Sequence, residues 1–577
     1  MITRRALNQF ALTSLSIAAL GCASPPKDRR PNVLLVMADQ WRGQSMGYEG
    51  DLNAETPSFD RFARESVNFD QAVSGCSVCC PARASLVTGQ YPLTNGVYIN
   101  DVPLRPSAPT LGEVFRTAGY RTAYVGKWHL YGSPDGRWER REDFIPSEFR
   151  FGFDYWKAAE ATHDYNRSFY YDNNDPEKRY WEGYDAFAQT EDACRFIQEN
   201  AGQSEPYFMM LSWGPPHFPL HTAPERYRAM FRDRPISLRL NVPDELAGAA
   251  TADLRGYYSH MAALDDCFAR VLDVVEASGQ VEDTVVVFTS DHGDMMESQG
   301  LSHKMVPWEE SIRVPFLLRY PRIHGTAGTR CGAPLNSPDI MPTLLGICGL
   351  PIPGSVQGSD FGTALWRGNV RNLPESAFLN NVVPAQVRQY GFAEYRGVRT
   401  RSHTYVRSIT GPWLLYDNTN DPYQKQNLCG RADLASLQEQ LEEELRRWLD
   451  LLDDDFLPAD EYLRRDGLSH YVELETPISY QRSPWADWES TLPTPDGPPD
   501  VRSSLKELFA APEAAAVVET VLPGLREHLV VAFAGRGFSL SMLHQYGPVR
   551  PGFPQISDMQ FAELERRLAQ PSKQQTK

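Results

Sequence analysis

Asn32-Val33-Leu34-Leu35-Val36-Met37-Ala38 is an unbroken apolar run that leads directly into Asp39-Gln40. Such a run is typical of a β-strand buried on both faces, as in parallel sheets covered by helices. The same pattern recurs at three other places in the chain, and each time polar residues stand where the run ends. We therefore expect strands of one mostly parallel sheet, with chemically capable side chains gathered beyond their carboxyl ends.

The other apolar runs have the same form as the first. They are residues 121–126, 207–213 and 284–290. The polar residues that follow them are, in the same order, Lys127 and His129, His217, and Asp291 and His292. Helix signals lie between the runs, at Thr56-Pro57, from Thr110 to Gly119 and from Ser337-Pro338 to Gly349. Strands that alternate with helices predict an α/β fold, with helices on both faces of the sheet.

Each of these polar residues also has a purely structural interpretation. Asp39 could cap a helix, and His217 could belong to a turn after two prolines. Lys127 and His129 could be solvated loop residues. Because four strand ends carry such residues together, a shared site is favoured over coincidence.

Composition and charge limit the classes of function. The chain has 577 residues, enough for about two to four domains with a large buried core. Hydrophobic residues make up 42% and charged residues 23%, as in ordinary globular proteins. The net charge of −17 disfavours binding to nucleic acid. An anionic substrate would therefore need a local cluster of cations or a metal.

The amino terminus, residues 1–24, reads as an export signal. A basic start at Arg4-Arg5 precedes an apolar run from Phe10 to Leu20 and the small residues that follow it. The run is too short to span a bilayer, and no later segment is long enough, so we expect no transmembrane segment. The arginine pair resembles a twin-arginine signal. Residues 19–22 resemble a lipoprotein box, which would lipidate Cys22; the alternative is cleavage after Ala23. The protein is expected to be exported, periplasmic or secreted, with or without a lipid anchor.

Cysteine usage favours neither a disulfide scaffold nor a zinc site. The nine cysteines are too few for a scaffold in a chain of this length. Cys76 and Cys79 form a C-x-x-C pair, but no second pair stands at zinc-binding spacing.

Cys79 instead stands at the start of a predicted helix. Pro81 suits its first turn and Gly89 its end, so the thiol would lie where a helix stabilises anions. The structural alternative is a small packed residue.

This segment resembles the signature of the formylglycine-dependent sulfatases of the alkaline-phosphatase superfamily, C-x-P-x-R-x-x-x-L-T-G. The residues that fit it are Cys79, Pro81, Arg83, Thr88 and Gly89. Val87 stands where leucine is usual. The resemblance also takes in residues 32–40, 126–130, 215–217, 290–293, Lys304 and 309–315. It implies an alkaline-phosphatase-like catalytic domain at 30–390, a small carboxyl-terminal α+β subdomain at 391–455 and an extension at 456–577, for which structural packing is the default role.

The resemblance also implies the cofactors. A separate maturation enzyme would oxidise Cys79 to formylglycine (3-oxoalanine), and Arg83 would steady the resulting diol. One divalent cation, usually calcium in this family, would be held at this position. Its ligands would be Asp39, Gln40, Asp291, His292 and the residue made from Cys79. Oxygen ligands suit calcium (Ca²⁺). Gln40 and His292 stand where many relatives have Asp and Asn, so manganese (Mn²⁺) stays open.

The chemistry of a sulfate monoester fits the remaining residues. Its cleavage needs a nucleophile, neutralised oxygens and a proton for the leaving group. Lys127 and Lys304 can supply fixed positive charge, and His217 can act as the acid. Lys127 and His129 would point to the same face of an extended stretch. By resemblance, His129 would assist release of sulfate from the formylglycine.

The substrate class rests on weaker signals. Aromatic and polar residues could line a sugar subsite, and the candidates are Tyr98, Asp101 and His163. An exported sulfatase of this kind resembles those that act on a sulfated polysaccharide or oligosaccharide. Two alternatives stay open: a phosphonate or phosphate ester hydrolase of the same superfamily, and a catalytically inactive glycan-binding protein.

Overall fold

The computed structural model describes residues 30–136, 140–368, 373–384, 387, 392–473, 499–501, 503, 505–526, 540, 543–544 and 556–569. The expected export signal, with Cys22, lies outside this range. No helix in the described part of the chain is both long and apolar enough to cross a membrane.

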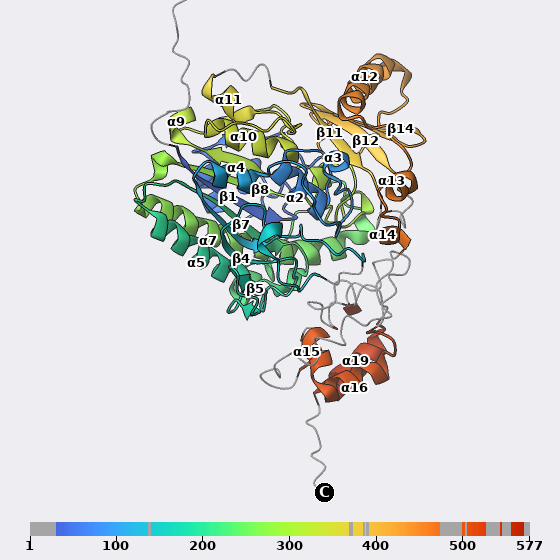
Figure 1. The fold of residues 1–577 in the computed structure, drawn as a ribbon. Coiled ribbons are helices and arrows are strands. Elements are labelled where there is room, and N and C mark those ends of the chain that lie inside the picture. Colours follow the sequence, from blue (N-terminus) through green and yellow to red (C-terminus); the bar gives the residue numbers. More distant parts are fainter. Residues whose placement is uncertain are drawn as a thin grey trace, which may run out of the picture.

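A ten-stranded sheet forms the centre of the molecule (Figure 1). Its strands are β1 (Asn32–Asp39), β2 (Val67–Asn68), β3 (Arg121–Lys127), β4 (Tyr155–Ala159), β5 (Phe169–Asp172), β6 (Arg179–Tyr180), β7 (Tyr207–Pro216), β8 (Thr284–Ser290), β9 (Phe316–Arg319) and β10 (Thr329–Arg330). They lie in the order β10-β2-β9-β8-β1-β7-β3-β4-β5-β6. The central strands β8, β1, β7, β3 and β4 are parallel, and β9, β5 and β6 pair antiparallel with their neighbours. The predicted α/β fold is confirmed.

Strand β1 is buried along its whole length, as its sequence predicted. Val33 and Leu35 face one apolar cluster, whereas Leu34 and Val36 face another on the opposite side of the sheet. Because successive side chains of a strand point to opposite faces, only an unbroken apolar run can fill both clusters.

Helices cover both faces. They are α1 (Pro57–Ala63), α2 (Cys79–Thr88), α3 (Pro92–Asn95), α4 (Leu111–Thr117), α5 (Asp185–Asn200), α6 (Glu225–Phe231), α7 (Ala247–Ala277), α8 (Glu309–Ile312), α9 (Pro321–His324), α10 (Ile340–Ile347) and α11 (Phe361–Trp366). Helices α1, α5 and α7 contribute to the cluster that contains Leu34, and α2, α4 and α10 to the cluster that contains Val33. A capping box between Thr110 and Glu113 begins α4, and Gly89 ends α2 with φ +65°. These ends agree with the predicted helix boundaries.

A second, four-stranded antiparallel sheet lies beside the first (Figure 1). Its strands are β11 (Ser376–Asn381), β12 (Tyr395–Thr400), β13 (His403–Ser408) and β14 (Gly411–Asp417), and α12 (Ala435–Leu452) packs on it. This sheet begins with β11, ahead of the boundary expected at residue 391, because β11 pairs with β12 over its whole length.

The carboxyl-terminal residues form two further groups. Tyr462 of α13 (Ala459–Arg465) and Tyr471 of α14 (His470–Glu473) join the apolar cluster that contains Val33. Helices α15 (Leu505–Ala510), α16 (Pro512–Val521) and α19 (Asp558–Leu568) surround an apolar cluster of their own. Figure 1 shows these three helices at the lower edge, away from the sheets.

Candidate active site

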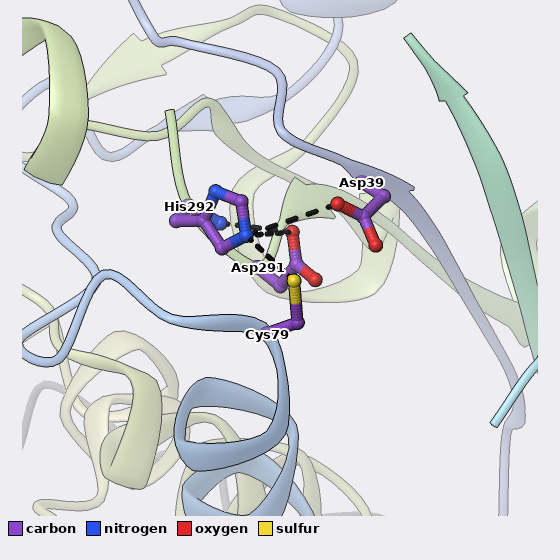
Figure 2. A group of neighbouring side chains, drawn as sticks. All are labelled: Asp39, Cys79, Asp291 and His292. Atoms are coloured by element: carbon purple, nitrogen blue, oxygen red, sulfur yellow. Dashed lines mark hydrogen bonds and ion pairs between the residues drawn. The ribbon is translucent and has the colours of Figure 1, made fainter. Parts of the chain in front are cut away.

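The central strands bring the predicted residues together at their carboxyl ends. Asp39 ends β1, and Asp291 and His292 follow the neighbouring strand β8. Figure 2 shows both carboxylates and the imidazole of His292 meeting the side chain of Cys79 at the start of α2. All four side chains are buried, and each offers a ligand atom within 4.8 Å of the others. The convergence expected from separate strand ends is therefore present.

Cys79 is the first residue of α2, where the unpaired amide groups of a helix favour a negative charge. Its Sγ lies 3.2 Å from Nε2 of His292 and 3.4 Å from Nζ of Lys304. Burial and the Asp39 carboxylate oppose ionisation of the thiol, but Lys304, Lys127 and His292 outweigh them and hold the pKa of Cys79 well below its ordinary value. The position is thus built to stabilise a nucleophile with anionic character.

Arg83 lies one helical turn after Cys79, so both side chains leave α2 on the same side. Its Nε donates to Asp291 over 3.0 Å, and its NH2 donates to Asp39 over 3.1 Å. Its NH1 donates to the carbonyl of Lys127 and to Oγ of Ser212. One guanidinium therefore fixes two carboxylates and the end of β3.

Asp39 and His292 each offer one atom that can bind a metal ion. Oδ1 of Asp39 is buried and has no hydrogen-bond partner among the described residues. Nδ1 of His292 lies 3.0 Å from the carbonyl oxygen of Gly293 and can donate to it, which leaves the lone pair of Nε2, 3.2 Å from Sγ of Cys79, able to bind a metal ion. Asp39 Oδ1 and His292 Nε2 are 3.8 Å apart. Carboxylate and imidazole donors held in this way fit a divalent cation.

The amide of Gln40 is fixed on both sides. Its Nε2 donates to Asp294, and its Oε1 accepts from Nζ of Lys304 over 2.6 Å. Its backbone lies in the left-handed region at φ +69°, and its N–H donates to Oδ1 of Asp291. The oxygen, rather than the nitrogen, of Gln40 therefore faces the site.

Two lysines supply positive charge in a buried setting. Nζ of Lys127 lies 2.6 Å from Oδ2 of Asp39, and Nζ of Lys304 lies 2.9 Å from Nε2 of His217. Burial and the Lys304 ammonium hold the pKa of His217 well below its ordinary value. Its Nδ1 lies 2.8 Å from the carbonyl of Phe218. A neutral His217 donates a hydrogen bond through Nδ1, and its Nε2 accepts one from the ammonium group of Lys304.

His129 reaches the site by a turn rather than by the extended alternation that the sequence suggested. Its φ is +60°, two residues beyond the end of β3. The carboxylate of Glu160, which follows β4, accepts three backbone N–H groups of residues 130–132 over 2.7–3.2 Å. Glu160, at the end of β4, therefore stabilises the turn in which Lys127 and His129 both face the cluster.

The three residues predicted to contact a sugar lie in different surroundings. His163 is half-buried, and its ring centroid lies 4.6 Å from that of His217. Asp101 is buried, forms a bidentate ion pair with Arg141 and lies 3.6 Å from Nε2 of His129. Tyr98 is 1% exposed, and its hydroxyl donates to Asp466. His163 therefore lies beside the cluster, whereas Asp101 and Tyr98 are engaged by other protein groups.

Several residues that contact the predicted residues or the turn at His129 were missed in the sequence. They are Asp294, Glu160, Ser212, Arg141 and Tyr471. Glu160 and Asp294 follow strand-like runs, so the rule that polar residues gather at strand ends could have found them. Tyr471 has no such signal, because nothing in the local pattern links it to the site.

Comparisons with known proteins cover the same residues. A family model described as Sulfatase matches residues 31–350. A second, described as N-sulphoglucosamine sulphohydrolase, C-terminal, matches residues 298–450. A protein of Formosa agariphila named ulvan-active sulfatase is 42% identical over 438 residues, covering 76% of this chain and 84% of the relative. An endo-4-O-sulfatase of Bacteroides thetaiotaomicron is 31% identical over 494 residues, covering 76% of this chain and 96% of the relative.

Solved structures share the fold. One, from work on the metabolism of multiple glycosaminoglycans by Bacteroides thetaiotaomicron, has a TM-score of 0.68 at 30% identity and covers 76% of this chain and 99% of its own. The phosphonate monoester hydrolase of Agrobacterium radiobacter has a TM-score of 0.59 at 24% identity, covering 74% of this chain and 96% of its own. The fold alone therefore does not separate sulfate from phosphonate esters.

Proposed function

This chain belongs to the sulfatase family, and we propose that it hydrolyses sulfate monoesters on a polysaccharide or oligosaccharide at the site around Cys79. The observation that carries the proposal is the position of Cys79, at the amino end of α2 between His292 and Lys304. The substrate class is supported by relatives whose names are ulvan-active sulfatase and endo-4-O-sulfatase.

The donor set fits one divalent cation and a formylglycine at position 79. Asp39, Gln40, Asp291 and His292 would hold the cation, and calcium is the metal we propose because oxygen atoms dominate this set. When bound, the cation would polarise the sulfate ester, and the hydrated aldehyde would supply the nucleophilic hydroxyl. A maturation enzyme would be required as a partner.

The remaining residues of the site can bind the anion and move protons. The charges of Lys127 and Lys304 both act on Cys79 in a buried setting, where fixed charges act strongly on a sulfate group. His217 and Lys304 form a hydrogen-bonded pair that can pass a proton to the leaving oxygen. His129 lies beside the side chain at position 79, and its protonated imidazole can donate a hydrogen bond to the oxygen there.

Burial opposes a charge on His129, but the groups around it outweigh burial and hold its pKa well above its ordinary value. Cys80 contributes most among these groups, and the nearby Asp101 carboxylate adds to the effect. We also propose export of the protein through residues 1–24, which would place it where extracellular polysaccharides are processed.

The maturation step is tested by the mass of the tryptic peptide that contains Cys79, from protein purified out of its own host. We expect an aldehyde in place of the thiol. An unmodified Cys79 in active protein would contradict formylglycine chemistry. In inactive protein, the same result would favour the glycan-binding alternative.

The reaction class is tested by comparing the hydrolysis of phenyl sulfate and of a phenyl phosphonate ester, together with sulfate release from sulfated polysaccharides. We expect sulfate esters to have the higher kcat/KM, and Cys79→Ala to abolish turnover. Faster turnover of the phosphonate would favour the phosphonate hydrolase alternative. Glycan binding without sulfate release would reject the enzymatic proposal.

A further inference from the structure

We propose that residues 459–471, which lie beyond both matched family models, form a brace that holds His129 in place through Asp101, with Tyr471 as its positioning residue. The inference rests on the proposed function, because it concerns the reactivity of the same site. It assigns a role to part of the carboxyl-terminal extension.

The brace contacts Asp101 and the segment that follows the turn at His129. The hydroxyl of Tyr471 donates to the carbonyl of Ser133 over 2.8 Å and lies 3.3 Å from the carbonyl of Asp101. Nε2 of His470 lies 2.8 Å from the carbonyl of Pro134. The N–H of Ser133 donates to the carbonyl of Asp101 over 2.7 Å. The hydroxyl of Tyr471 therefore bridges two loop segments that are already joined by a backbone hydrogen bond.

A second contact ties the brace to the segment that follows α3. The hydroxyl of Tyr98 donates to Asp466 over 2.9 Å, and the two residues are 368 positions apart in the chain. Tyr98 and Tyr471 are both buried, and Tyr471 is only 5% exposed. The contacts therefore belong to the packed interior, where a lost hydrogen bond is not replaced by water at no cost.

Asp101 is the link between the brace and His129. Its carboxylate is held by the bidentate guanidinium of Arg141, and its Oδ1 lies 3.6 Å from Nε2 of His129. Its backbone lies in the left-handed region at φ +65°, and its N–H donates to Sγ of Cys80 over 3.3 Å. A non-glycine residue in this conformation persists when its surroundings fix it, and Tyr471 is one of the groups that do so.

His129 depends on this link because it has few other restraints. Both of its ring nitrogens are buried and lack a hydrogen-bond partner by geometry within the described residues. Its orientation therefore follows the position of the nearby Asp101 carboxylate. A small displacement of Asp101 would move the imidazole relative to the side chain at position 79, and small displacements in an active site lower rates steeply.

The decisive variant is Tyr471→Phe, which removes one hydroxyl and keeps the ring. We expect kcat for an aryl sulfate to fall about tenfold while KM stays within about twofold, because the anion-binding lysines are untouched. The matched control is Tyr462→Phe in the same segment. The hydroxyl of Tyr462 donates to Asp454 rather than to the Asp101 loop, so its kcat should equal that of the wild type.

A double-mutant cycle separates positioning from general loss of structure. Asp101→Asn keeps a residue type that tolerates the left-handed backbone but removes the charge beside His129. We expect Tyr471→Phe to cause little further loss of kcat in the Asp101→Asn background, because both changes act through one link. A full tenfold further loss in that background would overturn the proposal.

Other outcomes are equally clear. Wild-type kcat in Tyr471→Phe, or an equal loss in Tyr462→Phe, would overturn the brace. If Tyr471→Phe fails to fold, Asp466→Ala is the second variant, because it removes the contact with Tyr98 at a partly exposed residue. It should lower kcat in the same way. Wild-type kcat in Asp466→Ala would then overturn the brace. The wild type is assayed first: absence of turnover there rejects the proposed function, whereas turnover with an unaffected variant rejects the brace alone.

Discussion

The side-chain amide of Gln40 has an oxygen that can bind a cation and a nitrogen that cannot, so its orientation matters. Asp294 fixes that orientation by accepting from Nε2. The other oxygen of Asp294 accepts the backbone N–H groups of Met296 and His303, so this carboxylate cannot easily turn away. A partner outside the ligand set thus decides which atom of Gln40 faces the site.

We predict that Asp294→Asn weakens calcium binding by about 10–100-fold, since the new amide would favour the flipped Gln40. Calorimetric titration of the metal-depleted protein with calcium measures this directly, without an activity assay. Glu297→Gln, in the same loop, is the control and should bind calcium as the wild type does. Equal affinity in Asp294→Asn would show that Gln40 is not oriented by Asp294.

At the scale of elements, one strand end supports the turn that follows another. Strands β3 and β4 are parallel neighbours, and Glu160 after β4 accepts the N–H groups of the turn after β3. Oε2 takes those of Leu130 and Tyr131, and Oε1 takes that of Gly132. This arrangement needs two acceptor oxygens. A carboxylate has two, whereas an amide has one oxygen and a nitrogen that can only donate.

We predict that Glu160→Gln lowers the free energy of unfolding by about 1–3 kcal/mol and also lowers kcat, since an amide N–H₂ would face a backbone donor. Urea unfolding and turnover of an aryl sulfate measure the two effects. Asp154→Asn at the other end of β4 is the control, because its side chain is 62% exposed, and its stability should change little. Wild-type stability in Glu160→Gln would refute the role of this carboxylate.

At the scale of the whole molecule, a buried ion pair joins the four-stranded sheet to helix α8. Arg399 on β12 forms a bidentate pair with Glu309 on α8, with both distances at 3.0 Å. Burial alone would raise the pKa of Glu309, but Arg399 outweighs burial and holds that pKa below its ordinary value of 4.5. A depressed carboxylate pKa stabilises the folded state above the unfolded pKa, and this contribution is lost as the pH falls through the folded value.

We predict that Glu309→Gln lowers the free energy of unfolding at pH 7 by about 3–5 kcal/mol, because Arg399 would stay buried without its charge partner. The difference from the wild type should shrink as the pH falls below 4.5. Urea unfolding at a series of pH values measures both effects. Glu443→Gln removes an exposed pair with Arg446 and should change stability by less than about 0.5 kcal/mol. A pH-independent difference would contradict this account.

Local sequence was sufficient for the α/β fold and for the residues of the central cluster. The apolar run at residues 32–38 requires burial on both faces, and the segment from Cys79 to Gly89 carries a helix start, a helix end and a specific motif. Both are properties of neighbouring residues, so they can be read without knowing the fold. Parallel strands then bring their ends together by geometry, which is why Asp39 and Asp291 meet.

Only the tertiary structure decided how those residues are held. Asp294 orients Gln40, Glu160 stabilises the turn at His129, and Tyr471 reaches the Asp101 loop across 370 positions of the chain. A hydrogen bond between distant residues leaves no periodicity and no spacing in the sequence, because either partner alone is compatible with many surroundings. The sequence by itself determined which groups gather at the ends of the central strands, and the packing of distant segments determined their orientation.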